Sequence, residues 1–377
     1  YKQIGAGFNK PLLTLHNKVE GTLSYINLLF IPDARPFDLF QMDVKSKIKL
    51  YSNRVLISDD SEDILPRWLR FVKGVVDTSD VDLNVSREML QHNSALNKIS
   101  KALKKRVLNE LKKMKDKDTE KYNTFWKEFG IVMKEGIYED FDLKNEILEI
   151  SKFHSMKLNK DVFLSEYSEG MDPEQKEIFY IASESKEMAE GSPHLEVFKK
   201  KKLDVLFFTD PIDTFWLSMA GEFQGKKFTS ITKGDIDLSA FSDEKKKKEK
   251  KDNIAIDGLV KKIKDILGEN VQDVKTSSKL VDSPCCLVAP DSGMDVQMER
   301  IMKIQNKDFK GMPRILEINP DHDIIKKLND IKDKEDDALK DAAYLLFDQA
   351  KMVEGELPLD ISLFNKRLSK FMGLALK

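Results

Sequence analysis

The sequence predicts a mixed α/β (α+β) protein: two α/β layers joined by a small helical segment, then a second α/β region that ends in helices. Three observations support this fold class. Runs rich in β-branched and aromatic residues alternate with helical patterns along most of the chain. A highly charged run interrupts the apolar pattern once, near residue 243. Beyond it the pattern is mixed again and finishes in helices.

The first part of the chain opens with strands and continues with helices. Residues 23–31 and 47–57 are β-rich, and Ile48, Leu50 and Val55 alternate within the second run as in a half-buried strand. A long amphipathic helix is predicted over residues 86–115, with Ser86 as its N-cap. A shorter helical pattern follows over residues 122–134 and places its aromatic residues on one face.

A second α/β pattern comes next. Strands are predicted over residues 178–183 and 203–209 with a helix between them, and this order favours a parallel crossover. Ser192-Pro193 supplies an N-cap and a proline at the first helical position. Asp213 is expected to cap the helix that follows the second strand.

The charged run marks the predicted domain boundary. We expect a domain over residues 1–243, a linker or polar helix start over 244–253, and a second domain over 254–377. In the second domain, Asp257 should open a helix that Gly268 closes. Strands are predicted over residues 271–276 and 285–289, and helices over 339–352 and 361–376.

Composition excludes several classes of function. There are 63 Lys and Arg against 65 Asp and Glu, a net charge of −2 that gives no support for nucleic-acid binding. No apolar stretch approaches the roughly 18 residues of a membrane span, so no membrane partner is predicted. The five histidines show no metal-ligand spacing, and no metal is expected. The two cysteines, Cys285 and Cys286, are adjacent, which favours a reducing compartment.

Arg87 stands in the first turn of the predicted long helix, where a cation opposes the helix macrodipole by roughly 0.3–1 kcal/mol. A shared anion such as a phosphate would make this placement useful, because a helix N-terminus and a guanidinium both bind phosphate. A surface arginine without a ligand is the alternative that the residues alone leave open.

Six blocks resemble the heat-shock protein 90 family of chaperones, in family order and over nearly the whole chain. The resemblance is to the middle and C-terminal domains, so the family's N-terminal nucleotide-binding domain is expected outside this sequence. The blocks are LLFIPDARPFDLF (residues 28–40), GVVDTSDVDLNVSREMLQ (74–91), SPHLE (192–196), EFQGK (222–226), SPCC (283–286) and EINPDH (317–322).

The tail does not end in the acidic Met-Glu-Glu-Val-Asp of eukaryotic cytosolic members. The chain therefore looks most like the bacterial, high-temperature protein G type, which implies a cytoplasmic location; an organelle is the second choice.

The resemblance assigns Arg87 a role in ATP hydrolysis. It implies that Arg87 reaches the γ-phosphate of ATP, in the manner of an arginine finger, and that Asn84 and Gln91 support its loop. ATP and Mg²⁺ would be bound by the N-terminal domain, so no cofactor is expected in this chain. One departure weakens the pattern: Leu56 stands where the family usually has a phenylalanine that helps the N-terminal domain dock.

Two apolar groups are candidate binding surfaces for unfolded client proteins. The resemblance places an exposed aromatic near Trp216, and a methionine stripe is soft enough to bind many sequences weakly. Core packing is the alternative, because apolar stripes usually face a core. The candidates are Phe215, Trp216, Met219, Met294, Met298 and Met302.

The last helix carries a seam suited to a helical partner, with apolar residues at steps of three and four. A two-fold pairing of two helices per protomer would bury it in a four-helix bundle, so a homodimer is predicted. The seam consists of Ile361, Phe364, Leu368 and Phe371.

Together these features predict an ATP-dependent, homodimeric chaperone that clamps unfolded or partly folded proteins. Its ATPase would be complete only with the N-terminal domain, and this chain alone should be inactive. The competing hypotheses are a non-enzymatic dimeric scaffold and a stand-alone hydrolase that uses Cys285 or a histidine.

Overall fold

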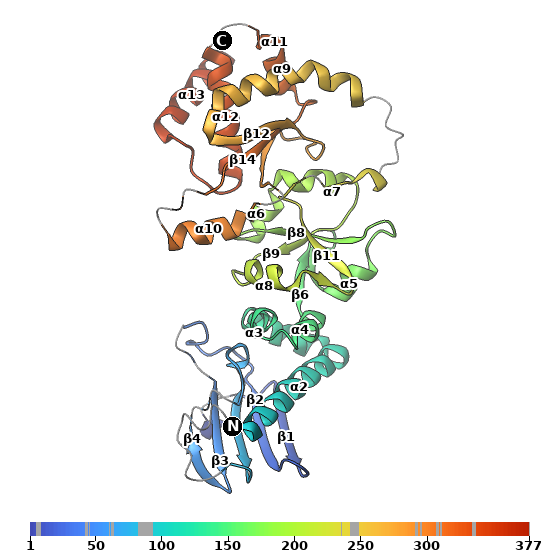
Figure 1. Ribbon diagram of the computed structural model, residues 1–377, viewed down its shortest axis with the longest axis vertical. Coiled ribbons are helices and arrows are strands. Elements are labelled where there is room, and N and C mark those ends of the chain that lie inside the picture. Colours follow the sequence, from blue (N-terminus) through green and yellow to red (C-terminus); the bar gives the residue numbers. More distant parts are fainter. Residues whose placement is uncertain are drawn as a thin grey trace. The chain divides into compact units, whose positions relative to one another are not determined.

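The structure, a computed structural model, confirms the mixed α/β class (Figure 1). It describes residues 1–377 except 5–8, 42–43, 45, 60, 62–63, 82–92, 235, 242–248, 291–292, 295, 307–308, 310, 334–336 and 377. The chain divides into two compact units. Unit 1 comprises residues 1–152, 163–165 and 216–223, and unit 2 comprises residues 153–162, 166–215 and 224–377. The boundary predicted at 244–253 falls within the last of these stretches, inside unit 2, and stays a prediction.

Unit 1 contains a five-stranded sheet in the order β1-β2-β5-β3-β4, and β3 and β5 are its parallel pair. The β-run predicted over residues 47–57 is two strands, because Asn53 and Arg54 have positive φ and form a hairpin turn. The strands are β1 (Leu13–Val19), β2 (Tyr25–Ile31), β3 (Lys47–Ser52), β4 (Val55–Ser58) and β5 (Lys73–Thr78).

Three helices complete most of unit 1: α2 (Ser94–Lys117), α3 (Thr119–Glu139) and α4 (Lys144–Ile150). The prediction of one helix starting at Ser86 is wrong at its N-terminus. Asn93 has extended backbone angles, and its side chain accepts hydrogen bonds from the amides of Ala95 and Leu96. It therefore caps α2 at that point.

A second sheet of six strands has the order β10-β11-β8-β9-β6-β7. The predicted crossover is confirmed, since β8 and β9 pair in parallel. Ser192 caps a short 3₁₀ turn, Pro193–Leu195, and Pro193 occupies its first position. The elements of this region are β6 (Lys152–Ser155), β7 (Lys160–Phe163), α5 (Leu164–Glu169), β8 (Glu177–Ala182), α6 (Lys186–Glu190), α7 (Glu196–Lys200), β9 (Leu206–Phe208), α8 (Asp213–Ala220), β10 (Glu222–Phe223) and β11 (Lys226–Ser230).

The C-terminal part of unit 2 builds a three-stranded sheet, β12-β14-β13, covered by helices (Figure 1). One of these helices contributes Leu259, Ile263 and Leu267 to a core that also contains Leu316 and Leu346. The elements are α9 (Glu249–Leu267), β12 (Val271–Thr276), β13 (Cys285–Val288), α10 (Val296–Gln305), β14 (Arg314–Ile318), α11 (Asp323–Ile331), α12 (Asp337–Val353) and α13 (Ile361–Ala375).

The helix expected to open at Asp257 begins earlier, at Glu249, so Asp257 lies inside α9 and does not cap it. Gly268 does follow its last residue, with a φ of 53°. That left-handed conformation suits glycine, and the predicted helix end is confirmed.

Candidate functional site

Arg87, Asn84 and Gln91 lie within residues 82–92, outside the described residues. The chain on either side of that segment is held by hydrogen bonds. The Ser52 hydroxyl donates to the Val81 carbonyl at 2.5 Å, and the Thr78 hydroxyl donates to the Ser24 carbonyl at 2.9 Å. On the far side, Asn93 caps α2. The segment that carries Arg87 is therefore attached to a sheet at one end and to a capped helix at the other.

Leu56, at the position where the resemblance expects a docking aromatic, lies on the edge strand β4. Its exposed fraction is 50%, and that of neighbouring Val55 is 51%. Two half-exposed aliphatic side chains on a sheet edge remain available to a second domain.

Trp216 is fully buried, so the expectation that it presents its indole to solvent is wrong. Ala220 lies four residues on, on the same face of α8, and is also buried. Met219 is 46% exposed, and Phe215 is half-buried. Of the residues predicted on this helix, Met219 offers the most accessible side chain.

We expect Trp216→Ala to lower the free energy of unfolding by about 3–5 kcal/mol, because it leaves a large cavity in a closely packed interior. Met219→Ala is the matched control and should change stability by less than about 1 kcal/mol, as partly exposed substitutions do. Urea unfolding followed by circular dichroism measures both. A Trp216→Ala protein as stable as wild type would contradict the burial.

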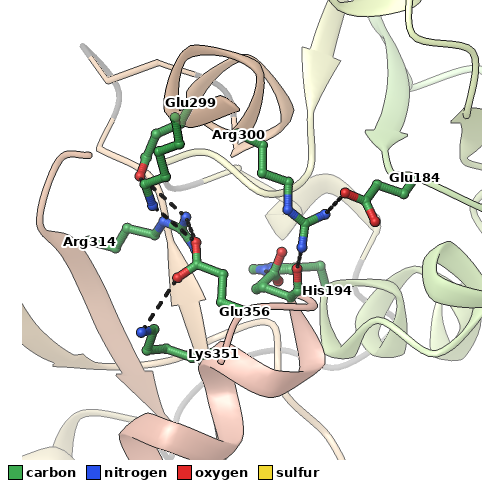
Figure 2. Close-up of polar contacts among 9 residues, drawn as sticks. Glu184, His194, Glu299, Arg300, Arg314, Lys351 and Glu356 are labelled. Carbon is green, nitrogen blue, oxygen red and sulfur yellow. Dashed lines mark hydrogen bonds and ion pairs between the residues drawn. The ribbon is translucent and has the colours of Figure 1, made fainter. Parts of the chain in front are cut away.

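The predicted methionine stripe lies on and just before α10. Met294, Met298 and Met302 are all half-buried, an intermediate result between the core and the surface alternatives. The charged face of the same helix is well connected. Glu299 is buried, and its carboxylate is 2.8 Å from the Lys303 ammonium (Figure 2).

Glu356, in the turn after α12, gathers cations around the same helix. Its carboxylate lies 2.5 Å from the Arg314 guanidinium, 3.5 Å from the Lys303 ammonium and 3.8 Å from that of Lys351 (Figure 2). Burial alone would raise the pKa of Glu356, but the attraction of Arg314, Lys303 and Lys351 outweighs it and lowers the pKa.

The lowered pKa of Glu356 makes a prediction about acid stability. Its ionised form stabilises the fold above the usual glutamate pKa of 4.5, and this contribution is lost as the pH falls below that value. Glu356→Gln should therefore be less stable than wild type at pH 7, and the difference should shrink toward about pH 3. Urea midpoints across that range measure it, with Glu269→Gln, at an exposed glutamate, as control. A difference independent of pH would contradict the role of the ionised carboxylate.

Two of the resembling sequence blocks meet in unit 2. The Glu196 carboxylate accepts hydrogen bonds from the amides of Val281, Asp282 and Ser283, at 2.6–3.2 Å. His194 is fully buried, and its Nε2 lies 3.0 Å from the Leu287 carbonyl oxygen. The SPHLE block thus fixes the loop that precedes β13.

The predicted seam on α13 is largely accessible. Ile361 is 53% exposed and Leu368 is 40% exposed. Phe364 and Phe371 are half-buried, and Phe371 packs against the core formed by α9, α12 and the three-stranded sheet. Asp341 of α12 holds the helix through Arg367 at 3.3 Å and Lys370 at 2.7 Å.

Sequence reasoning left out further exposed apolar side chains near that seam. Met372, four residues after Leu368, is 55% exposed, and its spacing continues the predicted stripe. Leu357 and Leu359, in the segment between α12 and α13, are 71% and 46% exposed. Heptad spacing could have identified Met372, whereas the two leucines precede the helix.

The cysteines are poor candidates for a hydrolase. Both thiols are buried, and burial raises the pKa of Cys285 to about 12. Such a thiol is protonated at neutral pH and is a weak nucleophile. Within the described part of the chain, no cluster of His, Cys, Asp and Glu could hold a metal ion. The helices among the same residues are too short or too polar to span a membrane.

Comparison with known proteins gives a consistent result. The model of the family described as Hsp90 protein matches residues 1–377. A chaperone protein HtpG of Roseobacter denitrificans is 43% identical over 383 residues, which cover 100% of this chain and 62% of that protein. One of Mesorhizobium japonicum is 42% identical and covers 99% of this chain and 60% of its own length. The chain thus spans about three fifths of the relatives that it matches.

Proposed function

The chain belongs to the Hsp90 protein family, and from that premise we propose that it forms the middle and C-terminal domains of an ATP-dependent molecular chaperone. The observation that carries the proposal is the family match over residues 1–377, with relatives named as chaperones at 43% and 42% identity. In the proposed protein, a homodimer clamps unfolded or partly folded clients, and ATP drives opening and closing of the clamp.

Arg87 is the proposed catalytic contribution of this chain, with Asn84 and Gln91 supporting it. A planar cation on the γ-phosphate neutralises the charge that spreads over the transferred phosphoryl oxygens. ATP and Mg²⁺ would be held by the family's N-terminal domain. The anchored ends of residues 82–92 support this role, because a loop that must reach another domain's ligand needs a fixed base.

Clients are proposed to bind the apolar side chains that remain accessible. These are Met219 on α8 and the half-buried Met294, Met298 and Met302, with Phe215 beside them. The exposed seam of α13 is proposed to pair with the same helix of a second protomer, because an unpaired apolar face of this kind is unusual on a monomer. Two buried cysteines without a disulfide fit the proposed cytoplasmic location.

An aggregation assay tests the chaperone activity. A chemically unfolded protein is diluted into buffer with and without the full-length protein, and light scattering is recorded. Suppression of scattering that depends on chaperone concentration and changes with ATP supports the proposal. No suppression at equimolar dimer, in any nucleotide state, would contradict it and favour a passive scaffold.

A further inference from the structure

Arg300 extends from α10 to two segments that are far from it in the sequence. Its Nη1 lies 2.8 Å from a carboxylate oxygen of Glu184, which follows β8. Its Nη2 donates a hydrogen bond of 2.6 Å to the carbonyl of Glu354, after the end of α12. Figure 2 shows the guanidinium between these two partners. A planar guanidinium can serve two acceptors at once, which a lysine ammonium does less rigidly.

Gly355 provides independent evidence that the Arg300 contact is built into the fold. It has a φ of 76°, a conformation that favours glycine. A Cβ at this position would lie 2.5 Å from Arg300 Nη2 and 2.7 Å from Met188 Cε. The turn therefore needs a residue without a side chain for Arg300 to reach the neighbouring carbonyl.

A second glycine serves the other charged side of α10. Gly311 has a φ of 78°, and a Cβ there would lie 2.1 Å from the Glu299 carboxylate and 2.7 Å from Lys303 Cε. Glu299 is in turn 3.6 Å from the buried Arg314. Close backbone approach and ion pairs thus fix the charged residues of α10 on more than one side.

The geometry of a helix relates this charged face to the methionines. At about 100° per residue, Met298 and Met302 both lie about 160° away from Arg300 around the helix axis. They are therefore on the opposite side of α10 from the guanidinium. Contacts that fix Arg300 also fix the direction in which these two methionines face.

We propose that Arg300 is a positioning residue that ties the methionine helix to Glu184 on one side and Glu354 on the other, so that client binding is transmitted to the segment after β8. The inference rests on the proposed function in one respect, namely that clients bind the methionine face of α10. Through Arg300, the parts of unit 2 before and after the charged run respond together to a client.

Hydrogen exchange of the 377-residue chain tests the transmission, with a reduced and carboxymethylated protein as a client that cannot refold. In wild type, saturating client should slow amide exchange in α10 and also in α6, which follows Glu184. In Arg300→Gln, the slowing in α6 should disappear even when the client is saturating. Glu184→Gln should reduce it, and the double variant should be no worse than Arg300→Gln, because both substitutions break one pathway.

Client affinity, measured by fluorescence anisotropy, gives the second readout. Arg300→Gln should weaken binding about tenfold, as loss of a hydrogen bond from a charged group does. Glu184→Gln should weaken it about twofold, since that carboxylate is half exposed. Arg300→Lys should lie between wild type and Arg300→Gln, and it replaces Arg300→Gln if that variant fails to fold. Lys261→Gln, on the exposed side of α9, is the control.

The outcomes separate the two proposals. If Met298→Ala with Met302→Ala leaves client affinity unchanged, the client-binding role of α10 fails. If that pair weakens binding but the client still slows exchange in α6 of Arg300→Gln as in wild type, the role of Arg300 is overturned. Unchanged affinity in Arg300→Gln would overturn it as well.

Discussion

Replacing Arg87 by alanine in the full-length protein should slow ATP turnover by at least about 10-fold and leave ATP affinity nearly unchanged. The guanidinium is expected to act mainly in the closed, transition-state-like form, so its loss lowers the turnover number more than it changes binding. Arginine fingers of GTPases contribute about 10³–10⁵ in rate, and we expect a smaller effect because ATP is bound by a separate domain.

Steady-state turnover at saturating ATP measures the effect of Arg87→Ala, and equilibrium titration with nucleotide measures affinity. Lys101→Ala, at an exposed position of α2, is the matched control for loss of one positive charge and should behave as wild type. Unchanged turnover in Arg87→Ala would remove the catalytic role and leave the loop a structural one.

Deleting every residue after Leu357 should convert the dimer into a folded monomer. The deletion removes α13, which contributes only the half-buried Phe371 to the described core of α9, α12 and the three-stranded sheet. The rest of that core remains, so folding should persist. An obligate apolar interface of this kind should bury more than about 1,200 Å² in total. Sedimentation at micromolar concentration measures the oligomeric state.

A point substitution tests the same seam without a deletion. Leu368→Asp places a charge in the proposed interface and should dissociate the dimer, whereas Ser369→Asp, at an exposed polar position of α13, should not. ATP turnover of the full-length dimer should fall with dissociation, because two nucleotide-binding domains are no longer held close together. A truncated protein that stays dimeric would show that the dimer contact lies elsewhere in the chain.

Local patterns in the sequence predicted many of the elements correctly. The β8–β9 crossover and the end of α9 at Gly268 follow from periodicity and turn chemistry over a few residues. The start of α2 was misplaced for a related reason. Ser86 and Asn93 are both good N-caps, and only the backbone angles of Asn93 show which of them caps this helix.

Burial and long-range contacts could not be predicted in this way. The apolar residues of α8 do not show which of them faces the core, so Trp216 was misassigned and Met219 was not. Arg300 meets Glu184 and Glu354, which lie in distant parts of the sequence. Nothing in the local sequence around α10 indicates either partner, because the two contacts depend on tertiary packing.

ATP turnover of the full-length protein, compared with that of this 377-residue chain, tests the central claim most directly. An ATP-driven chaperone whose nucleotide site lies in the family's N-terminal domain should hydrolyse ATP slowly and saturably when full length. The 377-residue chain alone should show no turnover above buffer. Turnover by the chain alone, or none by the full-length protein at saturating ATP, would contradict the account.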